Sequence, residues 1–214
     1  VLLTARLALY VATGATLVGA GWAWRLARSR RPPVVSLSAV AACLVVPGPL
    51  LGVAAIRLLN HPWGSPLAGL TWMYDHTLLG PWLVQMVRAT PIATLILWPA
   101  FASVPRAVVG AARSDGVPWW GVVPKIVAPM RWRAVAAAWL AAVATSVGEL
   151  AATKLVLPPG PTTVAERLFT LLHYGVEDRV AGLSLATIGF FLALSGAAAW
   201  LLRGAGVPGR QSSG

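Results

Sequence analysis

Acidic side chains and cysteine are scarce in this sequence. Its 214 residues include six Asp and Glu, against seventeen Lys and Arg, and one cysteine. With only Cys43, the chain cannot form an internal disulfide, and no metal-ligating residue neighbours it in its apolar run. No apolar run contains two carboxylates, and no Ser-His-Asp set is in reach, so acid–base and triad chemistry are not predicted. We therefore expect a chain that is not an enzyme.

A phosphate-binding loop is also missing. No glycine-rich stretch ends in Gly-Lys-Ser or Gly-Lys-Thr, so the chain is not expected to bind ATP itself. Charge is low throughout: 11% of the residues are charged and 57% are hydrophobic, with a mean hydropathy of +0.74. This balance excludes an ordinary soluble domain and favours a polytopic membrane protein.

Five apolar segments are long enough to cross a bilayer, which takes about 20 residues in a helix. They cover residues 1–24, 34–59, 78–104, 134–157 and 180–202. Their length and the lack of period-two alternation predict helices rather than strands. Prolines at 47, 49, 91 and 99 predict kinks, and the small residues at 136–138 and 196–199 predict close helix packing.

The basic residues lie in short segments between the apolar runs, so they indicate orientation in a bilayer rather than a nucleic-acid surface. The loop of residues 60–77 contains no Lys or Arg, and the segment between the fourth and fifth runs mixes Lys154, Arg167 and Arg179 with Glu166, Glu177 and Asp178. The other groups are Arg25, Arg28, Arg30 and Arg31; Arg106, Arg113, Lys125, Arg131 and Arg133; and Arg203 and Arg210. The positive-inside rule then places residues 25–31, residues 105–133 and the C-terminus in the cytoplasm, and the N-terminus outside.

The most informative stretch is the basic loop of residues 105–133. It contains two alanines, then a glycine after three residues, an isoleucine after nine more, and a proline three positions further on. These residues are Ala111, Ala112, Gly116, Ile126 and Pro129. The spacing resembles the coupling loop of ATP-binding-cassette (ABC) importer permeases, which reads E-A-A, three residues, G, nine residues, I-x-L-P. Gly110 stands where that motif has Glu, and Ala128 where it has Leu.

Further stretches resemble the C-terminal half of iron(III) permeases of the binding-protein-dependent type I class. They are residues 46–52, 148–153, 157–163 and 165–169, and the resemblance covers about residues 40–202. It implies an all-α integral membrane fold of about five transmembrane helices with a cytoplasmic coupling helix. Thiamine and polyamine permeases share much of this pattern. Because the resemblance is to iron(III) permeases, iron(III) is the expected cargo. Thiamine, a polyamine or another small solute is the alternative.

The resemblance also implies partners. A type I importer has two permease halves or subunits, two ABC ATPase subunits that bind ATP and Mg²⁺, and an extracytoplasmic substrate-binding protein. This chain would contribute no cofactor, and it would lie in the bacterial inner membrane. The expected organisation is a first helix with its basic loop (1–33), a permease core (34–203) and a cytoplasmic tail (204–214). No removable signal peptide is expected, because residue 1 opens directly into an apolar run.

The coupling loop is expected to act through its shape. Residues 106–115 predict a short helix whose alanines form a flat face, and Gly116 ends that helix with a positive backbone dihedral. The prolines at 118, 124 and 129 stiffen the exit into the next span. An ordinary basic juxtamembrane loop with interfacial tryptophans is the alternative. The residues assigned to ATPase coupling are Gly110, Ala111, Ala112, Arg113, Asp115, Gly116, Ile126 and Pro129.

Four polar residues in or near the spans are candidates for the substrate pathway: Gln85, Arg88, Glu149 and Lys154. A cation within the membrane costs roughly 2.5–3.5 kcal/mol on insertion scales, so Arg88 should face a cavity or a partner. A snorkelling or interhelical hydrogen-bonding role is the alternative for Arg88, and a structural role at the gate end of the span is the alternative for Glu149 and Lys154.

Other loop residues are assigned no chemistry. Asp75, His61, His76 and His173 do not have metal-ligand spacing, so no metal site is predicted. Residues 162–174 predict an interfacial amphipathic helix capped by Thr162 or Thr163. Two rival classes are an integral-membrane enzyme, which would require His or Asp within the spans, and a degenerate permease half that acts as a scaffold.

Overall fold

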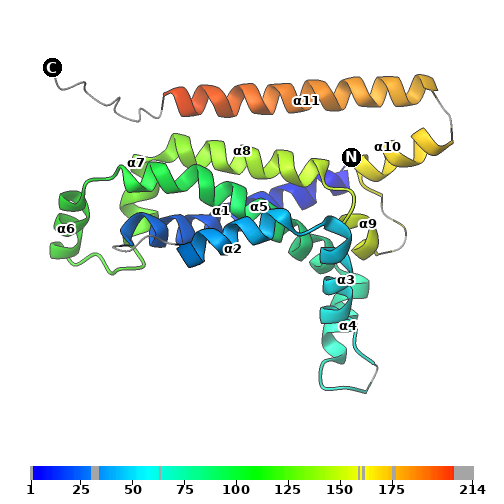
Figure 1. Ribbon diagram of the computed structural model, residues 1–214, viewed down its shortest axis with the longest axis horizontal. Helices are drawn as coiled ribbons and strands as arrows, with labels where there is room; N and C mark the ends of the chain where they lie inside the picture. The colour runs from blue at the N-terminus through cyan, green and yellow to red at the C-terminus, as the bar shows by residue number, and fades with distance from the viewer. Residues whose placement is uncertain are drawn as a thin grey trace.

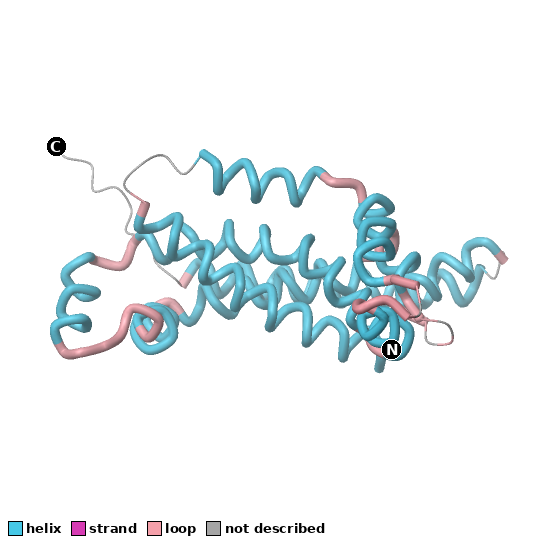
Figure 2. The backbone as a smooth tube through the Cα atoms, turned by 90° about the horizontal axis from the view of Figure 1, so that it is seen from below, coloured by secondary structure: helices cyan, strands magenta, loops and turns pink. Residues whose placement is uncertain are grey.

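Every element that the structure describes is helical, as the composition predicts. The computed structural model describes residues 2–29, 34–62, 64–158, 160, 162–174 and 177–204 (Figure 1). The tube view shows helix and connecting loops and no strand in these ranges (Figure 2). The elements are α1 (Leu2–Arg28), α2 (Val34–Val45), α3 (Gly48–Leu59), α4 (Ala68–His76), α5 (Leu79–Ala102), α6 (Arg106–Ser114), a π-helical turn η1 (Val123–Val127), α7 (Ala128–Met130), α8 (Trp132–Gly148), α9 (Thr153–Val156), α10 (Val164–His173) and α11 (Glu177–Arg203).

Three of these helices are long and apolar enough to cross a membrane: α1, α5 and the Val180–Arg203 part of α11. The number rises to five if each of two bent helix pairs is counted as one span. The predicted all-helical membrane class is confirmed, and the first, third and fifth spans lie close to their predicted bounds. The tail residues 205–214, with Arg210, and the loop residues 30–33 lie outside the described ranges.

The second span is not the continuous helix that was predicted. The helix stops at Val45, and α3 restarts at Gly48 with its axis turned by 100°. Pro47 has an extended backbone (φ −60°, ψ 139°) and no N–H to continue the hydrogen-bond ladder. A twelve-residue α2 rises about 18 Å, which is short of the roughly 30 Å hydrocarbon core. This span is therefore broken and not merely kinked. In contrast, α5 continues through Pro91 and Pro99 as one helix.

The outer half of the fourth span is also broken. α8 ends at Gly148, Glu149 has an extended backbone (φ −79°, ψ 111°), and the short α9 follows. The prediction of one helix over residues 134–157 is therefore wrong beyond Gly148. At its other end, α8 meets the segment Val123–Met130 at 91°. The fourth span is thus bent at its start and interrupted after Gly148.

The core consists of α1, α5 and α8, which pack together along their length, while α11 runs alongside α8 (Figure 1). Small side chains make this packing close. Ala137 and Ala138 are fully buried, as predicted, and a Cβ on Gly19 would lie 3.0 Å from the Cβ of Ala93. For residues 196–199 close packing stays a prediction, because a Cβ on Gly196 has no described neighbour within 4 Å in this chain. α11 is the peripheral helix of this chain.

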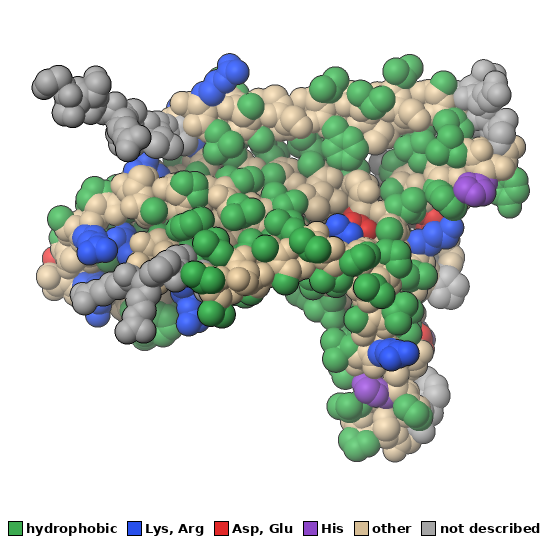
Figure 3. Space-filling view, viewed as in Figure 1, with side chains coloured by type: hydrophobic (Ala, Val, Ile, Leu, Met, Phe, Trp, Pro, Cys, Tyr) green, Lys and Arg blue, Asp and Glu red, His purple; other side chains and the backbone are tan. Residues whose placement is uncertain are grey.

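The arrangement of the helix ends agrees with the predicted topology. α6 and the end of α11 lie at one end of the bundle, and the N-terminus lies at the other (Figure 1). Hydrogen bonds join the helix ends on the side of α6: Arg28 donates to the Val104 carbonyl (3.3 Å), and Arg131 donates to the Ser103 carbonyl (3.2 Å). Lys and Arg side chains gather around α6 (Figure 3). We call this the basic end, and we call the end with α3, α4, α9 and α10 the outer end.

Candidate functional site

The predicted short helix of the coupling loop (residues 105–133) is present as α6. It begins after Pro105, whose fixed φ of −58° suits a helix start, and it stands clear of the bundle at the basic end (Figure 1). Ala112 is its one buried residue. Most of α6 is therefore displayed to the surroundings.

Gly116 ends α6 in the way that the sequence predicts. Its φ is +83°, its N–H donates to the Arg113 carbonyl (3.1 Å), and the Val117 N–H donates to the Ala112 carbonyl (3.0 Å). This pair of bonds is the Schellman motif, which satisfies carbonyls that the helix end leaves free. A Cβ here would meet no neighbour within 4 Å, so the dihedral, and not the available space, calls for glycine. Another residue would be strained by about 1–2 kcal/mol.

One face of α6 carries only small, exposed side chains. They recur at i, i+3, i+4 and i+7, the spacing that places residues on one side of a helix. A Cβ on Gly110 would meet nothing within 4 Å, so the chain leaves room there for the glutamate of the motif. The stripe consists of Ala107, Gly110, Ala111 and Ser114.

The remaining motif residues differ in their surroundings. Arg113 and Asp115 are exposed at the end of α6. Ile126 is half-buried in η1 next to the fully buried Val127, and Pro129 is exposed in α7. Ile126 and Pro129 therefore lie in the bent segment that leads into α8, and they do not lie on α6. The motif thus spans both a displayed helix and its attachment to the bundle.

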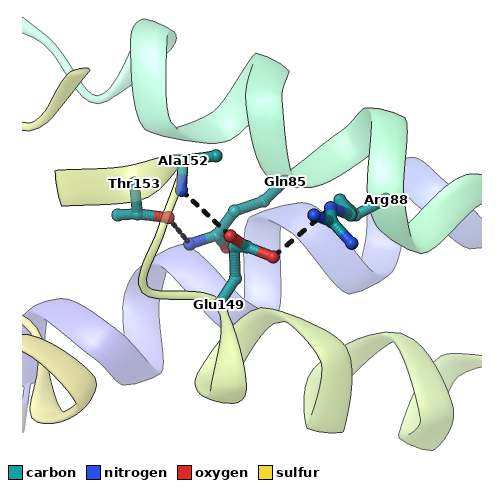
Figure 4. A network of polar contacts seen from close by, with 5 residues as sticks. All are labelled: Gln85, Arg88, Glu149, Ala152 and Thr153. Atoms are coloured by element: carbon teal, nitrogen blue, oxygen red, sulfur yellow. Dashed lines mark hydrogen bonds and ion pairs between the residues drawn. The ribbon is translucent and has the colours of Figure 1, made fainter. Parts of the chain in front are cut away.

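A polar cluster lies further along the bundle, where α5 passes the break after α8 (Figure 4). Gln85 is almost fully buried, and its amide nitrogen donates to the Thr153 hydroxyl (2.8 Å). The Ser146 hydroxyl donates to the Gln85 amide oxygen. Both ends of the Gln85 side chain are thus satisfied, as a buried amide requires. These bonds join α5, α8 and α9.

An ion pair completes the polar cluster. The Arg88 Nε lies 3.5 Å from the Glu149 Oε2, and the Glu149 Oε1 accepts from the Ala152 N–H at 3.0 Å (Figure 4). The two side chains are 27% and 10% exposed, so each charge is neutralised where water is limited. The same carboxylate also closes the turn that leads from α8 to α9. We use the name polar cluster for Gln85, Arg88, Ser146, Glu149 and Thr153.

The structure brings three of the four predicted pathway residues together and leaves Lys154 apart. The Lys154 Nζ lies 4.2 Å from the centroid of the Phe169 ring, and its side chain is exposed. Sequence reasoning missed Ser146 and Thr153. Each carries a hydroxyl group within an apolar run, and that was the one signal that could have identified it. It also missed Gly48, whose added Cβ would lie 3.2 Å from the Arg88 Nη2. The break between α2 and α3 therefore borders the polar cluster.

The histidines at the outer end have local partners. The ring of His76 stacks on Trp72 with centroids 5.2 Å apart, and the ring of His173 lies 4.3 Å from Phe169. The His61 ring nitrogen lies 2.9 Å from the Leu58 carbonyl. Across the part of the chain that the structure describes, no three His, Cys, Asp or Glu side chains gather as a metal site would need.

The helix predicted over residues 162–174 is present as α10, and its position at the membrane interface stays a prediction. Its cap is Thr163, whose hydroxyl accepts from the Glu166 N–H (3.2 Å). Thr163 and Glu166 have the T-x-x-E spacing of a capping box. The Val164 N–H also donates to the Thr4 hydroxyl (3.0 Å), so the start of α10 is held against α1.

No family model matches this chain. The chain is similar to the putrescine transport system permease protein PotI of Escherichia coli (strain K12). That protein is 26% identical over 166 residues, which make up 76% of this chain and 56% of the relative. The protein of the same name from Escherichia coli O6:H1 matches to the same extent.

The chain thus spans about half the length of the curated relatives it matches. The relatives are permease proteins of a transport system, which is the kind of protein that the sequence predicts. The comparison does not support the resemblance to iron(III) permeases in particular, because the relatives are putrescine permeases.

Proposed function

We propose that this chain is a permease subunit of a binding-protein-dependent ABC importer, in which it forms part of the substrate pathway and couples to a separate ATPase. The observation that carries this proposal is α6. The displayed small face, the termination at Gly116 and the position at the basic end all belong to α6, and the rest of the motif lies in the segment that follows it. The similarity to a transport-system permease over 76% of the chain supports the same class.

The attachment of α6 suits the transmission of force. Pro105 separates it from α5, and the segment Val123–Met130 meets α8 at 91°. The Arg131 side chain donates to the Ser103 carbonyl, which joins the two attachment points across the loop. A displacement of α6 by a bound ATPase would therefore act on α5 and α8 together. The polar cluster connects the same two helices, α5 and α8, at the ends that lie away from α6.

The polar cluster is proposed to line the pathway or its gate. It lies at two helix breaks, after α2 and after α8, where the backbone can change direction without melting a whole helix. The Arg88–Glu149 pair crosses from α5 to the second break. Arg88 and Glu149 separate only if the helices move or if another charged group takes their place.

We propose a polyamine-like solute as the cargo, because the relatives are putrescine permeases. Glu149 is the carboxylate of the polar cluster, at the break after α8, and it already has Arg88 as its partner. A polyamine cation would compete with Arg88 for Glu149, and the second permease would supply further carboxylates. Thiamine and other small solutes remain the alternative cargoes.

The proposed assembly follows from this role. It contains two ABC ATPase subunits that bind ATP and Mg²⁺, a second permease half or subunit and an extracytoplasmic binding protein, in the inner membrane of a bacterium. A degenerate, scaffolding permease half is the second candidate, and Gly110 in place of Glu is the observation that favours it.

Reconstitution tests the proposal. The chain would be placed in liposomes with the second permease and the ATPase of the same system, and its binding protein would be added with labelled putrescine, thiamine or an iron(III) chelate. We expect ATP-dependent uptake of putrescine that stops when this chain is omitted. Uptake of another cargo alone would overturn the polyamine assignment. Uptake that survives replacement of α6 residues would favour the scaffold.

A further inference from the structure

A cleft of about 470 Å³ lies between the end of α1, α6 and the stretch that follows Gly116. Three arginines line it: Arg28 from α1, and Arg106 and Arg113 from α6. No acidic residue is among its described lining residues, and Gly110, where the coupling motif has glutamate, forms part of its wall. We call it the arginine cleft. Its other lining residues are Trp24, Val109, Trp119 and Val122.

Within the described part of the chain, no carboxylate forms an ion pair with the guanidinium groups of the arginine cleft. The Arg88–Glu149 ion pair lies away from the cleft, in the polar cluster. Arg28 is held in place, because it donates to the Val104 carbonyl and its guanidinium carbon lies 4.4 Å from the Trp24 ring centroid. Arg106 lies close enough for its charge to act on Arg28. Like charges held together in one cleft favour an anion between them.

The surroundings of the arginine cleft match a lipid headgroup. Trp24 and Arg28 form the last turn of a membrane-spanning helix, so the cleft opens at the level of the bilayer surface. Half of its lining is apolar, and the neighbouring Trp119 and Trp120 are 73% and 66% exposed, which is typical of residues at the membrane interface. Basic pockets between helices on the cytoplasmic side suit anionic headgroups.

We propose that the arginine cleft binds the phosphate of an anionic phospholipid. Arg106 and Arg113 reach the phosphate from α6, Arg28 supports it from α1, and Trp24 and Trp119 contact the adjoining apolar part. The lipid supplies the negative charge that a glutamate at position 110 would otherwise provide. It also bridges α1 and α6, so the position of the coupling loop depends on the lipid. The proposal requires membrane insertion and does not depend on the transport role.

Native mass spectrometry of the full chain in mild detergent tests this directly, with dioleoyl phosphatidylglycerol and dioleoyl phosphatidylcholine as probes. The variant is Arg106→Gln with Arg113→Gln. The matched control is Arg25→Gln with Arg203→Gln, which removes the same charge from exposed cytoplasmic-side positions outside the cleft. We expect the wild type to retain phosphatidylglycerol at least tenfold better than phosphatidylcholine. The variant should lose at least fivefold of that retention, and the control less than twofold.

A second variant, Gly110→Glu, places a carboxylate in the cleft without removing an arginine, and it should lower phosphatidylglycerol retention about threefold. Equal losses in variant and control, or equal retention of the two lipids, would overturn the proposal. Displacement of the lipid by millimolar inorganic phosphate would assign the cleft to free phosphate. If the Arg106→Gln, Arg113→Gln variant keeps its lipid and loses the co-expressed ATPase, the lipid proposal is wrong and the cleft binds a carboxylate of the ATPase instead.

Discussion

Arginine is used differently at two places in this molecule. In the polar cluster, Arg88 has a carboxylate partner 3.5 Å away, and the neighbouring amide and hydroxyls are hydrogen-bonded to one another. In the arginine cleft, three guanidinium groups line one space with no acidic residue among them. The first region is complete within the chain, whereas the second needs a partner. The comparison suggests that the polar cluster holds the helices of this chain together and that the basic end binds other molecules, namely a lipid and an ATPase.

The largest expected effect is at the basic end. Gly116→Val forces a branched side chain into a φ of +83°, so α6 can no longer end as it does. We expect ATP-dependent uptake by the reconstituted system to fall more than tenfold while the chain still inserts.

Gly64→Val is the matched control for that change. Gly64 also has a positive φ (+95°) and open space around its Cβ position, but it lies in the loop at the outer end. It should change uptake less than twofold. Equal effects of the two variants would mean that backbone strain in general, and not coupling at α6, limits transport.

The next effect tests whether the polar cluster is complete within the chain. Glu149→Gln leaves Arg88 without its charge partner and should destabilise the protein by about 2 kcal/mol, less than a fully buried pair because Arg88 is partly exposed. Thermal unfolding in detergent measures this. Arg88→Met combined with Glu149→Gln should recover at least half of the loss. A double variant that is no better than the single would show that the pair is not coupled.

A smaller effect is expected where the two helix breaks meet. A Cβ on Gly48 would lie 3.0 Å from the Ala151 Cβ and 3.2 Å from the Ala152 nitrogen. Gly48→Ala should therefore lower stability by about 1 kcal/mol through overpacking. The control is Gly69→Ala in α4, where nothing lies within 4 Å, and it should be neutral or slightly stabilising. If Gly48→Ala is also neutral, the two breaks do not pack as described.

The smallest effect should follow from restoring the motif glutamate. Gly110→Glu is sterically free, because a Cβ there meets nothing within 4 Å. It adds one carboxylate among three arginines, and we expect about a twofold change in ATPase stimulation by the assembled permease. A change above tenfold would mean that position 110 contributes a specific contact and not only charge balance.

Much of the fold follows from the sequence. Hydropathy alone locates α1, α5 and α11, because long apolar runs must form helices in a bilayer. The spacing around Gly116 predicts α6 and its termination. The break at Pro47 has a visible cause, but its 100° angle depends on how α3 packs against α9. The break after Gly148 has no proline and is held by the Glu149 side chain, which only the folded chain reveals.

The site was less predictable than the helices. Gln85, Arg88 and Glu149 stand out as polar residues in apolar runs, but which of them meet depends on the packing of α5 against α8. Lys154 looked equivalent in sequence, yet the turn that starts at Glu149 directs it toward Phe169. The arginine cleft also combines residues 24–28 with residues 106–122, and this proximity is a tertiary property.

Cysteine cross-linking tests the central claim, that α6 binds an ATPase, most directly. Replacing Cys43, the one native cysteine, by serine leaves a background for Ala111→Cys on the exposed face of α6 and for Leu172→Cys on α10. Each variant would be co-expressed with the ATPase of its own system, labelled at its cysteine with a maleimide–diazirine reagent and illuminated, so that the diazirine inserts into a neighbouring protein. We expect an adduct with the combined mass of chain and ATPase for Ala111→Cys and none for Leu172→Cys. Absence of the adduct from Ala111→Cys in an assembled complex, or equal adducts from both positions, would contradict it.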